Sequence, residues 1–127
     1  MLTFRYSRGE YPPAPYITLE ITPSGRRRKP IRRRAKLDTG ASLTVIPDTL
    51  PGRWRIDSVG TATLRAYNGQ KSRRPVYVVD VIIGSKRFQD VSVTVAPRRN
   101  ILLGRDILNQ LRITLDGPLQ IIDIHDV

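Results

Sequence analysis

The segment at residues 35–47, AKLDTGASLTVIP, contains a single carboxylate in a setting where it could do acid and base chemistry. Asp38 follows a strand-like run and precedes Thr39 and Gly40, so a carboxylate, a hydroxyl and a glycine are adjacent. A carboxyl group held in a fixed position can take up or release a proton during a reaction. The same three residues also suit an ordinary turn, because Asp and Gly favour turns for backbone reasons. The choice between these interpretations depends on the surrounding elements.

Alternation of apolar and polar residues predicts that almost the whole chain is β-strand. Residues 16–22 alternate, and the turn signal at residues 23–25 predicts that the arginine-rich segment returns as the second arm of a hairpin. That arm would end at Leu37, directly before the Asp38 turn. One short helix is predicted at residues 105–111, where apolar residues fall on one helical face.

A second hairpin is predicted between residues 59–67 and residues 74–83. Its tip, Asn68-Gly69, suits the two positive φ values of a type I′ turn. Further strands are predicted at residues 86–96, 112–115 and 119–124. Many short strands with one late helix indicate an all-β barrel or sandwich.

Length and composition limit the class of protein. The 127 residues fit one domain with its own core, and we expect residues 1–15 to form an N-terminal arm and residues 16–127 the domain. The absence of Cys excludes disulfides and thiolate zinc sites, and His125 is the only histidine, so we expect no metal and no other cofactor. No signal-like or membrane-spanning apolar run is visible, so we expect a soluble, cytoplasmic protein without membrane contact.

The net charge of +11 comes mainly from one segment. Eight of the 22 Lys and Arg residues lie within residues 26–36, and the remaining 14 against 11 acids leave only +3. Such a block can contact RNA or DNA. Without a recognition helix or interleaved aromatic residues, it is more often a solvated surface. The residues considered for nucleic-acid contact are Arg26, Arg27, Arg28, Lys29, Arg32, Arg33 and Arg34.

The Asp38 segment and residues 100–108, NILLGRDIL, share the order and spacing of a known family. Over roughly residues 16–124, the chain resembles the retropepsin-like aspartic proteases, in particular their small bacterial single-domain members. The resemblance implies a closed β-barrel with a flap hairpin and one short C-terminal α-helix. Gly104 is then expected where backbone passes close behind the Asp38 loop and leaves no room for a Cβ. The alternative is a simple break between strand and helix.

The resemblance also implies that Asp38 is the catalytic carboxylate of an aspartic endopeptidase. Two carboxylates that share one proton can activate a water and protonate the peptide carbonyl, which predicts an acidic pH optimum. The chain has only one Asp-Thr-Gly, since residues 57–59 lack the glycine and residues 116–117 lack the hydroxyl. An active enzyme would therefore be a symmetric homodimer with one Asp38 from each subunit.

Neighbouring residues receive supporting roles from the same resemblance. Thr39 would join the two loops by hydroxyl-to-backbone hydrogen bonds across the dimer axis. Viral members commonly have an acid at the position of Ser42, where it contacts the arginine that matches Arg105. Because Ser42 is neutral, Arg105 needs another partner and is a candidate for an ion pair. The loop support is completed by Gly40, Ala41, Ser42 and Gly104.

The hairpin tip is the candidate flap, with substrate contacts expected from Tyr67, Asn68 and Gly69. An extended peptide or protein substrate would pair its backbone with the flaps as an added strand. Tyr67 could instead face the core or solvent. We expect the dimer to rest more on the C-terminal residues 119–127 than on residues 1–15, because a proline run is a poor donor to a strand ladder.

Three functions from different classes fit the sequence. The favoured one is an active homodimeric aspartic endopeptidase. The second is a retropepsin-fold dimer that binds peptides with little or no turnover, since a fold does not guarantee chemistry. The third is a basic β-barrel that binds nucleic acid through residues 26–36, with an affinity that falls steeply with salt.

Overall fold

Strands β2 (Tyr16–Pro23) and β3 (Ile31–Leu37) form the hairpin that carries Asp38, in a computed structural model that describes all of residues 1–127. The two strands pair in antiparallel register, as the sequence predicts. The alternation in β2 buries one face, and the buried residues of that face are Ile17, Leu19 and Ile21. This hairpin delivers the Asp38 segment to one end of the molecule.

Six strands close into a barrel. Strand β3 pairs in parallel with β8 (Ile101–Leu103), β8 pairs with β4 (Val45–Pro47), and β4 pairs in parallel with β7 (Lys86–Ala96). Strand β7 pairs with β6 (Lys71–Ile83), whose far end returns to β2. This last pairing closes the ring, and β5 (Gly60–Arg65) extends the sheet beyond it as a partner of β6 alone. The predicted closed all-β barrel is confirmed.

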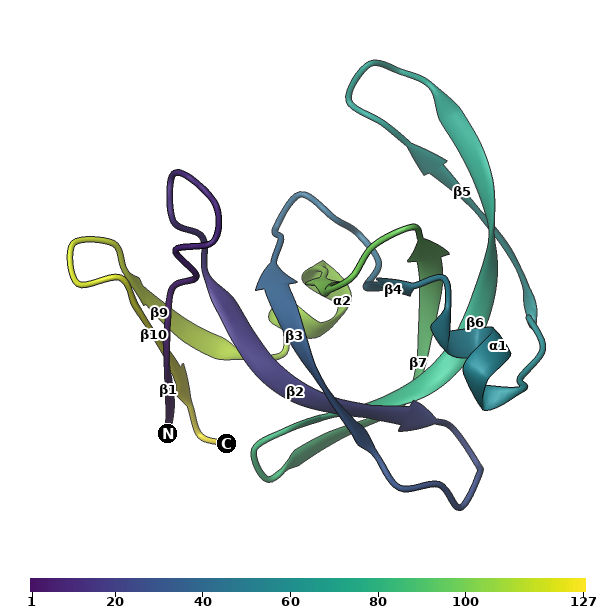
Figure 1. Cartoon of the computed structure of the whole chain (residues 1–127), viewed down its shortest axis with the longest axis horizontal. Helices are drawn as coiled ribbons and strands as arrows, with labels where there is room; N and C mark the ends of the chain where they lie inside the picture. Colours follow the sequence, from purple (N-terminus) through teal and green to yellow (C-terminus); the bar gives the residue numbers. More distant parts are fainter.

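The two ends of the chain meet in a second sheet of three strands. Strand β10 (Ile121–His125) lies between β1 (Leu2–Arg5) and β9 (Arg112–Asp116), and the termini lie close together in Figure 1. The proline run predicts a poor ladder donor throughout residues 1–15, but residues 2–5 pair with β10, because the prolines lie only at positions 12, 13 and 15. Within residues 119–127, which we expect to contribute to the dimer, β10 has a strand partner on each side in the protomer. The edges without a β partner belong to β1 and β9.

Two short helices complete the fold, where the sequence predicted one. Helix α2 (Arg105–Leu108) lies within the predicted helical segment. Helix α1 (Leu50–Trp54) was not predicted, because its five residues are too few to display a helical period. Trp54 is almost completely buried, so α1 packs on the barrel. No helix in this structure has both the length and the apolar character that crossing a membrane requires.

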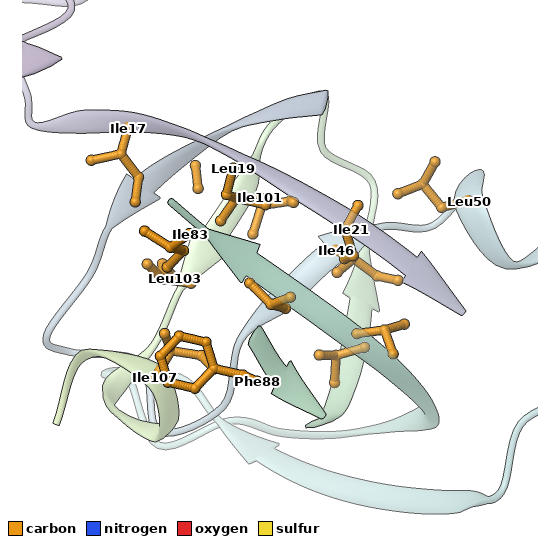
Figure 2. Packing of buried hydrophobic residues seen from close by; sticks show 14 of the residues in the cluster. Ile17, Leu19, Ile21, Ile46, Leu50, Ile83, Phe88, Ile101, Leu103 and Ile107 are labelled. Atoms are coloured by element: carbon orange, nitrogen blue, oxygen red, sulfur yellow. The ribbon is translucent and has the colours of Figure 1, made fainter. Parts of the chain in front are cut away.

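One cluster of 18 buried apolar side chains fills the barrel and joins it to both helices and to β10. Figure 2 shows Ile83, Leu103 and Ile101 gathered between the crossing strands, and Phe88 and Ile107 belong to the same cluster. Complete burial of such a side chain stabilises the fold by roughly 1.5–3 kcal/mol. The core therefore fixes β3 and β8, whose C-terminal ends lead into the Asp38 loop and the Gly104 segment.

Candidate active site

Asp38 is the first residue after β3, and both its backbone and its carboxylate are held. Its N–H donates to the carbonyl oxygen of Leu103 at 3.0 Å, which extends the pairing of β3 with β8 by one step. Its Oδ1 accepts the N–H of Gly40 at 2.9 Å. The residue is half-buried, so its carboxylate has a defined orientation and remains open to solvent on one side.

Space, and not backbone conformation, explains the two glycines of the site. A Cβ built on Gly104 would lie 2.7 Å from the carbonyl carbon of Leu43 and 2.9 Å from the carbonyl oxygen of Ala41. Both distances are shorter than real Cβ contacts, so the close approach expected at Gly104 is present. A Cβ on Gly40 would lie 3.1 Å from Oδ1 of Asp38 and would crowd the carboxylate.

Thr44 and Asp106 join the two segments, and the sequence analysis did not single out either residue. The N–H and the hydroxyl of Thr44 donate to the two carboxylate oxygens of Asp106 at 3.0 and 2.8 Å. The Thr44 hydroxyl also accepts the N–H of Gly104 at 3.2 Å. Thr44 is completely buried. The sequence signal that could have identified Asp106 is an acidic residue two positions after Gly104.

Arg105 binds backbone carbonyls, and it takes part in neither of the two salt bridges of the chain. Its N–H donates to the carbonyl oxygen of Ala41 at 2.8 Å, and its guanidinium Nη1 donates to the carbonyl oxygen of Thr39 at 2.6 Å. The expected ion pair is therefore absent from the protomer. The reason is that Ser42, which is exposed, supplies no carboxylate. The guanidinium group of Arg105 therefore donates to a backbone carbonyl oxygen instead.

The surface beside Thr39 is apolar. Thr39 is exposed, and its hydroxyl makes no hydrogen bond within the protomer. A groove of about 270 Å³ lies next to it. Leu115, at the edge of this groove, is 51% exposed. The apolar side chains that line this groove are Leu37, Leu108, Leu111, Ile113 and Leu115.

The β5–β6 hairpin projects from the barrel body at the upper right of Figure 1. The N–H of Gly69 donates to the carbonyl oxygen of Ala66 at 2.9 Å, and Oδ1 of Asn68 accepts the N–H of Gln70 at 3.0 Å. Only Gly69 has a positive φ, of 85°. The predicted type I′ turn is therefore wrong, because that turn needs positive φ at two residues; a three-residue loop with glycine in the left-handed region is present instead. Tyr67 is fully exposed at this tip.

A short N-terminal loop is attached to the end of β3. The carbonyl oxygen of Pro15 accepts the N–H of Leu37 at 3.0 Å. Lys36 forms a salt bridge with Glu10, whose carboxylate also accepts the hydroxyl of Tyr16 at 3.1 Å. The hydrogen bond between them lowers the pKa of Glu10 and raises the pKa of Lys36. These contacts position the strand end from which Asp38 emerges.

No three His, Cys, Asp or Glu side chains gather in a way that could hold a metal ion. The chemistry available at this site is that of a carboxylate placed by backbone hydrogen bonds. A carboxylate of this kind can act as a base when ionised and as an acid when protonated.

Comparison with solved structures defines the fold class. The chain is similar to the retropepsin-like aspartic protease from Rickettsia conorii, with a TM-score of 0.67 and 17% identity over 97% of this chain and 88% of that one. It is similar to the EIAV protease complexed with the inhibitor HBY-793, with a TM-score of 0.57 and 19% identity over 84% and 93% of the two chains. A foamy viral protease-reverse transcriptase, in complex with an RNA/DNA hybrid, has a TM-score of 0.55 and 17% identity over 82% of this chain and 14% of that one. The fold is that of the retropepsins.

The sequence itself then defines the family. Residues 30–110, more than half of the chain, match the family model described as "gag-polyprotein putative aspartyl protease". The protein belongs to this retropepsin-like aspartyl protease family. The matched residues include both the Asp38 loop and the Gly104 segment.

Proposed function

We propose that this protein is a homodimeric aspartic endopeptidase whose catalytic dyad consists of Asp38 from each subunit. The observation that carries the proposal is the state of the Asp38 carboxylate, which is oriented by the Gly40 N–H at 2.9 Å and is open to solvent. Membership of the aspartyl protease family supports the same function. Because one chain supplies one such carboxylate, two chains related by a two-fold axis are needed for a dyad.

In the dyad, the two chemically equal Asp38 carboxyl groups would share the proton transfers of the reaction. Two neighbouring carboxylates do not both ionise readily, so one would be ionised and the other protonated. The ionised Asp38 takes a proton from a water, whose oxygen attacks the peptide carbonyl carbon while the protonated Asp38 donates to the carbonyl oxygen. The Asp38 that took the proton from water then delivers it to the amide nitrogen, and the C–N bond breaks while the other Asp38 recovers a proton from a hydroxyl of the tetrahedral intermediate. The Gly40 N–H would keep the carboxylate oriented throughout.

The apolar groove beside Thr39 supports the dimer. Its exposed side chains, including Leu115, would be removed from water by a second copy of the chain. The Thr39 hydroxyl, which makes no hydrogen bond within the protomer, would find a backbone partner on the second loop. The free edge of β9 borders the same groove through Ile113 and Leu115.

The hairpin of β5 and β6 would cover the substrate. Strand β5 is the last strand of its sheet, so its outer edge has free backbone groups to which an extended peptide could add. Tyr67 and Asn68 at the tip would then contact the peptide. Opening of the two hairpins would admit a protein substrate.

The test compares the wild type with Asp38→Asn, which keeps the shape of the side chain and removes the carboxylate. Both proteins are incubated with a complex peptide library from about pH 4 to about pH 8, and new termini are identified by mass spectrometry. We expect cleavage by the wild type alone, fastest at acidic pH. If neither protein cuts at a concentration where light scattering shows dimers, the endopeptidase proposal fails and the peptide-binding alternative replaces it.

A further inference from the structure

A basic groove lies away from the catalytic loop, beside the first half of β3. We define it by the five arginines that line it, Arg32, Arg33, Arg34, Arg98 and Arg99. The groove has a volume of about 490 Å³. Asp38 lies four residue steps after Arg34 along an extended strand, which corresponds to about 13 Å. The groove is therefore distinct from the site proposed for peptide hydrolysis.

None of these five arginines forms a salt bridge within the chain, although Arg98 lies close enough to Glu10 to help lower the pKa of that carboxyl group. The two salt bridges of the protein involve Lys36 and Arg87, and no carboxylate lines the groove. Arg33 donates to a backbone carbonyl at 2.9 Å, Arg98 donates to the carbonyl oxygen of Asn100 at 3.2 Å, and Arg34 lies over the ring of Tyr16 at 4.7 Å. Since these partners carry no negative charge, the gathered guanidinium groups favour an anion in the groove.

The positive surface extends beyond the groove. The loop before β3 carries Arg26, Arg27, Arg28 and Lys29, all of them exposed. No acidic residue occurs anywhere in residues 21–37. From Arg28 to Arg34 an extended chain covers about 20 Å, which is enough to face several anionic groups in a row. A polymeric anion therefore fits this surface better than a single phosphate.

The lining of the groove favours nucleic acid over an acidic protein segment. Leu50 is the one hydrophobic side chain among its nine lining residues. Protein interfaces have an apolar centre, which is absent here. Nucleic acids, in contrast, are bound largely through phosphate contacts and counterion release. We propose that the basic groove and the loop at residues 26–29 bind the phosphate backbone of nucleic acid without reading its sequence.

The test measures binding of the full-length chain to a fluorescent oligothymidylate of about 20 nucleotides, by anisotropy, from about 50 to about 300 mM KCl. The groove variant is Arg32→Gln/Arg34→Gln/Arg99→Gln, which changes three exposed residues. The matched control is Arg5→Gln/Arg65→Gln/Arg112→Gln, also at exposed positions away from the groove. Each variant lowers the formal net charge from +11 to +8. Thermal melting checks that each variant is folded. If the groove variant is not folded, the single variant Arg99→Glu, which changes a residue outside any strand, replaces it in the binding measurement.

We expect the groove variant to bind at least about tenfold more weakly than the wild type, with a salt slope that is smaller by up to about 2. The control should stay within about threefold of the wild type. Equal losses in the two triple variants would overturn the proposal, because net charge alone would then explain binding. Polyglutamate that competes as well as unlabelled oligothymidylate would also overturn it, in favour of an acidic protein partner.

Discussion

The loop that carries Asp38 and the tip of the β5–β6 hairpin differ in how they are held. The loop at residues 38–44 is tied to residues 103–106 through backbone, hydroxyl and carboxylate hydrogen bonds, and its Thr44 is completely buried. The hairpin tip makes only local hydrogen bonds, and Tyr67 lies fully in solvent. Low local stability is typical of segments that move when a ligand binds. The comparison contrasts a carboxylate held by long-range contacts with a hairpin tip held only by its own hydrogen bonds.

The largest expected effect comes from disturbing the fixed region at Gly104. Gly104→Ala forces a Cβ against the backbone of Leu43 and Ala41, so we expect a loss of about 3 kcal/mol in the free energy of unfolding, measured with urea. Peptide cleavage should fall with it. The control is Gly60→Ala, where an added Cβ meets no atom within 4 Å and φ is not positive. Equal losses in both variants would show that the loop can shift.

Removal of one hydroxyl tests the same region more gently. Thr44→Val keeps the shape of the side chain but leaves the Asp106 carboxylate and the Gly104 N–H each short of one partner. We expect a loss of about 2 kcal/mol in the free energy of unfolding. Thr63→Val, at an exposed position on the hairpin strand β5, should change it by less than about 0.5 kcal/mol. A neutral result at Thr44 would mean that the backbone contacts suffice.

Asp80 extends the comparison to the two ends of one strand. It lies in the part of β6 that belongs to the barrel, whereas the other end of β6 leads to the hairpin tip. Burial raises the pKa of Asp80, but hydrogen bonds from Ser24, the Asp90 N–H and Arg87 outweigh it, so the pKa lies below its usual value of 3.8. A lowered pKa in the folded state stabilises the protein above the unfolded pKa, and this stabilisation disappears as pH falls through the folded pKa.

We therefore expect Asp80→Asn to lower the free energy of unfolding at pH 7 by about 2 kcal/mol. The difference from wild type should shrink steadily below about pH 4, as the wild-type carboxyl becomes protonated. Unfolding curves across this pH range measure it. Asp57→Asn, at an exposed carboxylate, should give a curve parallel to that of the wild type. A constant Asp80→Asn difference at all pH values would contradict the role assigned to the charge.

The smallest effect on stability should come from the hairpin tip. Tyr67→Ala removes a side chain that contacts solvent, so we expect a change below about 0.5 kcal/mol in the free energy of unfolding. If the hairpin is the flap, kcat/KM for peptide cleavage should nevertheless fall about tenfold, because a substrate contact is lost. Unchanged kcat/KM would remove Tyr67 from the substrate site.

Local patterns could be predicted from the sequence, and distant contacts could not. The β2–β3 hairpin and strand β7 followed from alternation, and β7 has the predicted bounds, residues 86–96. Strands β4 and β8 have three residues each, too few for a period, and they join the barrel partly through parallel pairings that local turns do not specify. Thr44 and Asp106 were missed because they are 62 residues apart in sequence and meet only in the folded chain.

The sheet that joins the two ends of the chain also sets an order of events during synthesis. Leu2 pairs with Ile124, and the Thr3 side chain donates to Asp123, 120 residues later. Strand β1 is therefore synthesised before the barrel strands and finds its partner β10 only after all of them have been made. Contacts at such separation form slowly in folding. A nascent chain that has not yet reached β10 therefore leaves β1 without its strand partner.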